Sequence, residues 1–415
     1  MFRLVFLVNA VSALSSSSRD CTAWFKAQGG VAEAVVAREV EYGWGLVTTR
    51  EVRKDETLLE TPRELCLAAE DGPEFLRRTA GQEGMPSVSG GAVVASRLLM
   101  AQKDEKFREY LDSLPEVSVP VVWPDAAELL YGTQTLASRK ELLDEWRQDF
   151  HAILKRGGGD VFSEDEDQWE SWLKASALVM SRSYNAEPLG YAMIPFLDYV
   201  NHDDTPSARV STDGRSASLV ATRDIPKDTQ IFASYSGFER LDGLKMLQAF
   251  GWLPNEIDTC NVDFVEALSK DDPLAPAKFE LLNAIGSRAI FTVDRRLSKE
   301  VNDAHLETTI HDIALPALRL IALQDQLAFK NILSNVPDSA WFKGQSIGND
   351  HTAISTGIDL LHRKINSLDA GHNRRQAARS KCTDPLVASL ADQTATSERA
   401  ALVVLRDALT TLQQR

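Results

Sequence analysis

The sequence predicts an α+β protein: a strand-rich domain interrupted by a helical insertion, followed by an all-helical C-terminal domain. Three observations predict this arrangement. Short apolar segments alternate with turn residues from Val35 to Ala69, helical periodicity replaces them over about 72–180, and strand-like segments return after Pro195. Beyond Leu253 the apolar residues have helical spacing almost throughout. One β domain with a helical insertion explains this order better than separate modules do.

A hairpin is the clearest local signal in the second strand-rich block. Strand-like segments at Arg209–Ser211 and Ser216–Thr222 lie on either side of Asp213 and Gly214. Glycine supplies the positive φ angle that such a tight turn needs. A third strand is expected over Gln230–Ser234.

A short internal repeat occurs in both strand-rich blocks, and we call its two copies the echoed segments. Residues 49–55 and 222–228 share a Thr-Arg start, an acidic residue, a β-branched residue and a Lys-Asp end. We interpret each copy as the end of a strand, an inward-facing Val52 or Ile225, a turn at Lys-Asp and a returning apolar strand. The alternative is that β-hairpin proteins in general produce such echoes.

The helical segments follow from spacing and from end signals. Ser163 and Glu166 form a capping box that begins a helix expected to run to about Ser183. We place the strand-rich domain, with its helical insertion, over 21–255 and the helical domain over 256–415. Further helices are predicted at Ala92–Ala101, Lys106–Leu114, Ser138–Arg156, Ala277–Arg296, His305–Leu333, Thr352–Asn366 and Ser397–Gln413.

Composition excludes some classes of function. The chain has 415 residues, 44% hydrophobic and 25% charged, which suits an ordinary globular protein with two cores. Its formal net charge of -15 disfavours a broad phosphate-binding surface, since nucleic-acid binding depends on Lys and Arg. We therefore expect no nucleic-acid partner. No segment after the N-terminus is apolar enough to suggest a membrane span.

The four cysteines carry little information about chemistry. Cys21, Cys66, Cys260 and Cys382 are scattered and form no C-x-x-C pair. Neither a zinc cluster nor a dense disulfide framework is implied, so free thiols are expected.

Residues 1–20 have the features of a targeting segment. Arg3 precedes an apolar run from Leu4 to Leu14, and a Ser-rich stretch follows. The run is too short for a membrane span, and a cut after Ala13 fits a cleavable signal peptide. The Ser-rich stretch is also compatible with a transit peptide. We expect a plastid or secretory route, and a cytoplasmic location if the segment is not a signal.

The densest group of unusual residues is the segment from Ile194 to Asp204. An Asn-His pair directly after an apolar run offers an amide and an imidazole to a polar ligand. One alternative is a strand end with an Asx turn. Another is a metal site from Asp198, His202 and Asp204, although no second His or Cys nearby completes a tetrahedral set.

A second group lies at Ile231–Phe238. Tyr235 follows a predicted buried strand and precedes Gly237, so its hydroxyl can enter a pocket while its ring stays packed. The alternative is that Tyr235 is a core residue whose hydroxyl is simply hydrogen-bonded.

Taken in order, these motifs resemble the SET domain. The branch they resemble contains the Rubisco large-subunit lysine methyltransferase and the actin histidine methyltransferase, and the likeness covers nearly the whole chain after the targeting segment. The resemblance implies a knotted, β-rich SET domain and a helical domain that presents a protein substrate. It rests on Glu41–Leu46, Ser181-Arg182, Pro195–Asp198, Asn201-His202 and Tyr235.

The resemblance also implies roles for individual residues. S-adenosylmethionine is the implied cofactor, no metal is required, and the enzyme is expected to be a monomer. Tyr235 is implied at the methyl-transfer centre and Asp198 close to the substrate channel. The implied cofactor contacts are Tyr42, Gly43, Trp44, Arg182, the Asn201 side chain, the His202 backbone and Phe250 or its neighbour Trp252.

Methyl transfer asks mainly for alignment of a neutral amine or imidazole with the methyl carbon. A lysine acceptor of a non-histone protein is the first hypothesis, and a histidine acceptor is the alternative. A catalytically silent binding protein is a third hypothesis. Tyr42 stands where relatives often have Glu, and Gly243-Leu244-Lys245 replaces a usual Asn-Ala-Glu.

The targeting segment can be tested directly. Protein purified from its source should begin near Leu14 or later, and removal of residues 1–20 should leave the thermal unfolding curve unchanged. Edman sequencing or intact mass spectrometry measures the first residue. An N-terminus at Met1 in native tissue would contradict the hypothesis.

Overall fold

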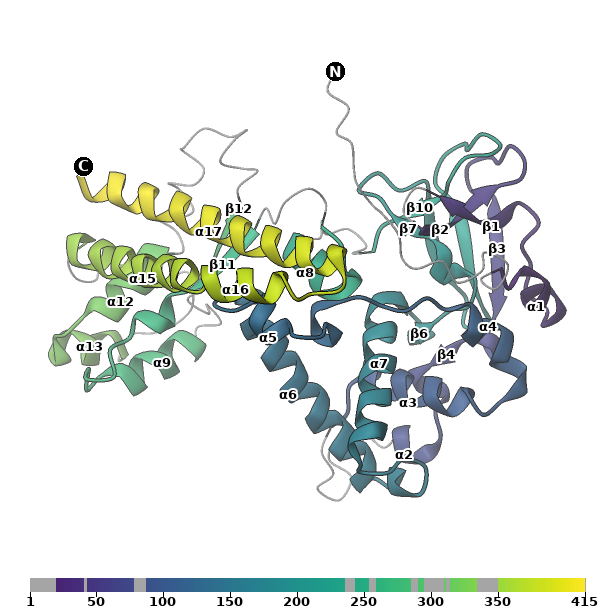
Figure 1. The fold of residues 1–415 in the computed structure, drawn as a ribbon, viewed down its shortest axis with the longest axis horizontal. Coiled ribbons are helices and arrows are strands. Elements are labelled where there is room, and N and C mark those ends of the chain that lie inside the picture. Colours follow the sequence, from purple (N-terminus) through teal and green to yellow (C-terminus); the bar gives the residue numbers. More distant parts are fainter. Residues whose placement is uncertain are drawn as a thin grey trace. The chain divides into compact units, whose positions relative to one another are not determined.

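The computed structural model describes residues 20–40, 43–77, 87–235, 243–253, 259–284, 290–294, 310, 314–333 and 350–414 (Figure 1). The chain divides into two compact units. The first is built from residues 1–123, 139–241 and 248–251, and the second from 124–138, 242–247 and 252–415. The predicted order of strands, helices, strands and a helical C-terminal region is confirmed.

Several small sheets, rather than one large sheet, make up the strand-rich part of the first unit. β1 (Val35–Val40) pairs with β2 (Gly43–Thr48) and β7 (Asn201–His202) pairs with β10 (Phe232–Ala233). Two three-stranded sheets have the orders β3-β9-β8 and β4-β6-β5. Their strands are β3 (Thr57–Pro62), β4 (Leu67–Ala68), β5 (Ser183–Ala186), β6 (Gly190–Met193), β8 (Ala208–Thr212) and β9 (Ser216–Ala221).

Helices lie between β4 and β5, as the sequence predicts. The α-helices of the first unit are α1 (Thr22–Ala27), α2 (Glu74–Arg77), α3 (Gly90–Ala101), α4 (Arg108–Ser113), α6 (Gln134–Lys155) and α7 (Glu166–Arg182), of which α6 has its first turn in the second unit. Short 3-10 helices lie between these helices and the strands: η1 (Arg63–Leu65), η2 (Ala69–Asp71), η3 (Glu105–Phe107), η4 (Pro120–Val122), η5 (Gly158–Asp160) and η6 (Leu197–Tyr199).

The start of α7 differs from the predicted capping box. Asp165 is the N-cap, and its Oδ1 accepts a hydrogen bond of 2.8 Å from the Gln168 backbone N–H. Ser163 instead donates its hydroxyl proton to the Asp165 carboxylate. An ionised acceptor at a helix N-terminus also interacts favourably with the helix dipole, which explains why the carboxylate takes this position.

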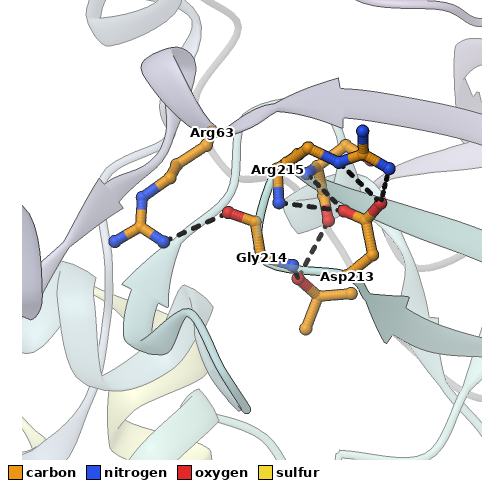
Figure 2. Close-up of polar contacts among 6 residues, drawn as sticks. Arg63, Asp213, Gly214 and Arg215 are labelled. Atoms are coloured by element: carbon orange, nitrogen blue, oxygen red, sulfur yellow. Dashed lines mark hydrogen bonds and ion pairs between the residues drawn. The ribbon is translucent and has the colours of Figure 1, made fainter.

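The predicted hairpin between β8 and β9 is confirmed. Figure 2 shows Asp213 at its centre: Oδ1 accepts from the backbone N–H groups of Arg215 (2.9 Å) and Ser216 (3.0 Å). Gly214 has φ +83°. Its carbonyl accepts a bond of 3.1 Å from Arg63 Nη1, which attaches the turn to η1.

The two echoed segments pair with each other. Val52 and Ile225 form an antiparallel bridge in which each backbone N–H donates to the other's carbonyl at 2.9 Å. Both side chains are inward, with exposures of 0% for Val52 and 2% for Ile225. The prediction that one β-branched residue of each copy packs inward is confirmed.

The turns of the two copies are also equivalent. Asp55 and Asp228 end the two Lys-Asp turns with φ of +65° and +57°. The Asp55 N–H donates to Ala221 O at 2.9 Å, and the Asp228 N–H donates to Thr48 O at 3.0 Å. Each copy therefore ends by bonding to the strand that enters the other copy, so the two strand-rich blocks hold one another.

Helices make up most of the second unit, which has its own core. They are α5 (Ala126–Leu129), α9 (Ala275–Ala284), α12 (Leu315–Ala322), α13 (Gln326–Leu333), α15 (Asp350–Ala370), α16 (His372–Arg379), α17 (Pro385–Gln414) and the short η7 (Phe264–Ala267), while α8 (Gly243–Phe250) has residues in both units. α15 and α17 lie side by side (Figure 1). Leu318, Leu361 and Leu405 are fully buried in this core.

One pair of strands interrupts the helices of the second unit. β11 (Thr259–Asp263) and β12 (Ile290–Asp294) are antiparallel. The helical character of the region is confirmed, but the predicted helix over Ala277–Arg296 ends at Ala284 and its last part is β12. The run Ile-Phe-Thr-Val favours a strand because β-branched and aromatic residues lose side-chain freedom in a helix.

A buried carboxylate fastens α17 to the first turn of α6. Glu398 is 2% exposed. It accepts bonds from the backbone N–H groups of Gln134 (2.7 Å) and Thr135 (3.2 Å) and from the Thr135 hydroxyl (2.9 Å). The N-terminal amides of a helix lack intrahelical partners, so Glu398 supplies them from a distant part of the chain.

The pairing of the echoed segments can be tested by truncating a buried side chain. Ile225→Ala should lower the free energy of unfolding by about 2 to 5 kcal/mol, since it removes buried methyl groups and leaves a cavity. Leu327→Ala is the control, because Leu327 is 69% exposed and its truncation should change stability by less than about 0.5 kcal/mol. Calorimetric unfolding measures both. Equal stabilities of the two variants would contradict the structural role of Ile225.

Candidate active site

The site is built around a tight turn that follows β6. Phe196 has φ +70°, a value that is rare for a bulky residue, and it is fully buried. Its ring stacks on Phe25 of α1, with centroids 4.6 Å apart and an angle of 9° between the planes. The strained backbone is therefore held by packing, and it directs the chain into η6 and then β7.

Three side chains donate hydrogen bonds to carbonyl oxygens of this turn. Arg182 Nη1 donates to Asp198 O (2.9 Å), the Tyr184 hydroxyl to Leu197 O (3.2 Å) and the Tyr235 hydroxyl to Val200 O (2.8 Å). Buried carbonyl groups without partners are costly, so these donors add to the backbone bonds of the turn, such as that from Val200 N–H to Leu197 O at 3.1 Å. They also bring the end of α7, β5 and the residues after β10 together at one turn.

Asn201 lies where three strands meet. β7 pairs in parallel with β10, with Asn201 opposite Phe232. The Asn201 amide donates to Trp44 O at 3.3 Å. At Gly45, an added Cβ would lie 3.0 Å from Asn201 Nδ2 and 2.9 Å from Gln230 Nε2. A side chain at position 45 would therefore force the Asn201 and Gln230 amides to shift.

His202 uses its ring within the protein. Nδ1 accepts a hydrogen bond of 3.2 Å from the Tyr235 backbone N–H, and Nε2 lies 3.4 Å from Asp204 Oδ1. The ring centroids of His202 and Tyr235 are 5.2 Å apart. The ring of His202 is therefore engaged within the protein, and its backbone belongs to β7, which pairs with β10. Contact of the His202 backbone with a cofactor stays a prediction.

Tyr235 combines a packed ring with a polar hydroxyl. Its ring contacts Phe250 with a centroid distance of 4.6 Å. Burial raises the pKa of Tyr235 to about 12, and the nearby Arg182 charge opposes this shift. The phenol is therefore a neutral donor at physiological pH. Its proton goes to Val200 O, which leaves the lone pairs of the oxygen as acceptors.

Asp198 is a buried carboxylate at the same turn. It is 8% exposed, and its Oδ2 accepts a bond of 3.0 Å from the Tyr110 hydroxyl. Burial raises the pKa of Asp198, while the Arg182 charge and the Tyr110 hydrogen bond oppose the rise. Oδ1 has no hydrogen-bond partner among the residues that the structure describes. Such an atom favours a ligand that donates a hydrogen bond.

The remaining predicted residues differ in how they are placed. Gly43 begins β2 with φ +93° and open space beside it. The Trp44 ring lies 6.2 Å from that of Tyr199. Tyr42 lies outside the described residues. Trp252, the alternative to Phe250, is 42% exposed.

Two residues of this site escaped the sequence reasoning. Tyr184 lies two positions after Arg182, and strand alternation after the helix would have placed both on one face. Tyr110 comes from α4 in the helical insertion, 88 positions before Asp198, and no local pattern connects the two.

The alternative metal site is not supported by the geometry. Among the described residues, which include Asp198, His202 and Asp204, no group of three or more His, Cys, Asp or Glu could hold a metal ion. The four cysteines are free thiols. No helix within the described ranges is both long and apolar enough to cross a membrane.

Comparison with known proteins identifies similar sequences. Residues 43–236 match the SET domain family. The human N-lysine methyltransferase SETD6 is 23% identical over 333 residues, spanning 71% of this chain and 69% of that protein. The chloroplastic [fructose-bisphosphate aldolase]-lysine N-methyltransferase of Arabidopsis thaliana is 29% identical over 215 residues, 48% of this chain and 43% of that protein.

Solved structures with the same fold extend over most of the chain. A structure of Rubisco LSMT bound to AdoMet has a TM-score of 0.68 at 15% identity and covers 97% of this chain and 93% of that one. The SET domain of LSMT bound to lysine and AdoHcy has a TM-score of 0.66 at 14% identity, with coverage of 95% and 90%. At this identity the likeness establishes the fold.

The Asn201 amide can be tested as a ligand contact. Asn201→Ala should abolish thermal stabilisation by S-adenosylhomocysteine and leave the ligand-free protein folded, since a ligand stabilises only the state that binds it. At a hundredfold excess over the dissociation constant, the expected stabilisation of the unmodified protein is about 2.7 kcal/mol. Asn185→Ala, at an exposed position of β5, is the control. Unchanged ligand-induced stabilisation of Asn201→Ala would contradict the assignment.

Proposed function

We propose that this chain, whose residues 43–236 match the SET domain family, transfers a methyl group from S-adenosylmethionine to a lysine side chain of a non-histone protein. The observation that carries this proposal is the position of the Tyr235 hydroxyl. It is held by Val200 O at the turn that also bears Asp198 and Asn201. The N-lysine methyltransferases among the relatives support a lysine acceptor over histidine.

The residues present fit this cofactor. Open space adjoins Gly43, and the Asn201 amide lies against the backbone of β2. We assign cofactor contacts to Tyr42, Gly43, Trp44, Arg182, the Asn201 side chain, the His202 backbone and Phe250. When bound, S-adenosylmethionine supplies the electrophilic methyl carbon. The protein's own task is to align the nucleophile.

Tyr235 orients the incoming amine. Its hydroxyl gives its proton to Val200 O, so its oxygen can accept a hydrogen bond from the substrate nitrogen. With a pKa near 12, the phenol neither ionises nor exchanges protons with the amine at neutral pH. A lysine must first lose its proton, and a buried site favours that loss by disfavouring the ammonium. Asp198 lines the substrate side of this turn.

The second unit offers surfaces for a protein substrate. Phe279 of α9 is 47% exposed and Leu327 of α13 is 69% exposed, and large apolar side chains in such positions favour protein contacts. We assign substrate presentation to this helical domain. We also propose a monomeric enzyme. The N-terminal segment and the chloroplastic relative support a plastid route.

The proposal predicts a specific defect for Tyr235→Phe. This variant keeps the ring and removes the hydroxyl, so it tests the polar contact alone. Loss of one well-placed polar contact in a transition state costs about 2.7 to 4 kcal/mol, so turnover should fall about a hundredfold or more. Mass spectrometry of lysates after incubation with labelled S-adenosylmethionine measures methylated lysine.

Tyr131→Phe, which removes a hydroxyl in the second unit, is the matched control and should methylate normally. Binding of S-adenosylhomocysteine should be similar in both variants. A Tyr235→Phe protein that methylates normally would make Tyr235 a core residue. An unmodified protein that binds no S-adenosylhomocysteine would instead support the catalytically silent alternative.

A further inference from the structure

Only one of the two carboxylate oxygens of Asp198 has a hydrogen-bond partner among the described residues. Its Oδ2 accepts from the Tyr110 hydroxyl at 3.0 Å, whereas Oδ1 is buried and has no partner among the described residues. An ionised carboxylate has about four acceptor positions, and leaving one oxygen buried without a donor is costly. A ligand that places a hydrogen-bond donor on Oδ1 offsets this cost.

Packing holds Tyr110 in one position. The residue is 0% exposed, and its ring stacks on Trp24 of α1 with centroids 5.6 Å apart and planes at 13°. The Trp24 indole N–H donates to Lys106 O at 2.7 Å, and the Ser113 hydroxyl donates to Tyr110 O at 2.6 Å. With both the ring and the backbone held, the Tyr110 hydroxyl has a defined direction toward Asp198.

We propose that Tyr110 is a positioning residue whose hydroxyl holds the Asp198 carboxylate so that Oδ1 receives an N–H donor of the substrate lysine. The inference rests on the proposed function, because it concerns the acceptor side of the same site. It gives the helical insertion a role in substrate recognition, since Tyr110 belongs to α4 and lies outside the strand motifs that carry the family resemblance.

The hydroxyl also favours the ionised form of Asp198. A donor to a carboxylate lowers its pKa, and the Tyr110 bond opposes the rise that burial causes. Loss of this donor therefore raises the pKa of Asp198, so that lysine binding should be lost at a higher pH. The backbone N–H groups of Phe196 and Asp198 also favour the ionised form. The other side chains that act electrostatically on Asp198 are Arg182, Tyr184, Tyr199, Tyr235 and Cys21, and all of these groups remain in a Tyr110 variant.

The experiment titrates free L-lysine into the full chain saturated with S-adenosylhomocysteine, from pH 5 to pH 8, by calorimetry. The lysine ε-ammonium stays charged over this range, so a change in affinity reports on the protein. Tyr110→Phe should weaken lysine binding about tenfold at neutral pH and move the acid loss of binding to higher pH. Tyr191→Phe, at a half-buried tyrosine of β6, is the control and should change neither.

A double-mutant cycle separates positioning from general structural damage. Asp198→Asn should remove most of the lysine affinity and its pH dependence, and Tyr110→Phe should then have no further effect in that background. Equal losses from Tyr110→Phe with and without Asp198 would overturn the proposal. Unchanged lysine binding by Asp198→Asn would also overturn it. If Tyr110→Phe does not fold, the Asp198→Asn variant still tests the proposal.

The outcomes also separate this inference from the proposed function. A protein that fails to bind S-adenosylhomocysteine overturns both. Two other outcomes overturn the role of Tyr110 without contradicting the cofactor site. In one, the protein binds S-adenosylhomocysteine but not L-lysine. In the other, the unmodified protein and the Tyr110→Phe variant bind L-lysine equally well.

Discussion

The structure of the site depends on how the buried carbonyl oxygens of the turn after β6 find donors. Phe196 bends the chain with a positive φ, and the carbonyls that follow lie inside the first unit. Arg182, Tyr184 and Tyr235 supply the donors. The same bonds that stabilise the turn also align the residues assigned to chemistry, so local stability and function share one set of contacts.

A second constraint brings these donors to the turn from distant parts of the chain. The echoed segments around Val52 and Ile225 bond to each other and close the two strand-rich blocks into one body. β2 and β10 extend from these blocks, with Val47 opposite Gln230. Because Gln230 leads directly to β10 and Tyr235, this pairing fixes where the hydroxyl lies relative to β2 and Asn201.

Charge at the site is distributed among groups with different tasks. The phenol of Tyr235 stays neutral because burial raises its pKa to about 12. The pKa of Asp198 is shifted in opposite directions. Burial raises it and favours the neutral form, whereas Arg182 and Tyr110 lower it and favour the ionised form. A hydrogen-bond donor brought to this carboxylate by a ligand would favour its ionised form.

By itself the sequence determined the order of strands and helices, the hairpin at Asp213-Gly214 and the inward packing of Val52 and Ile225, because each follows from local periodicity and turn chemistry. Ordered motifs also made Arg182, Asn201, His202 and Tyr235 candidate site residues. It misassigned the segment at 290–294 as helix, because strand pairing with β11 overrides local spacing. Only the tertiary structure decided that Tyr110 meets Asp198 and that Tyr184 meets Leu197, since contacts between residues far apart in sequence depend on how the whole domain packs.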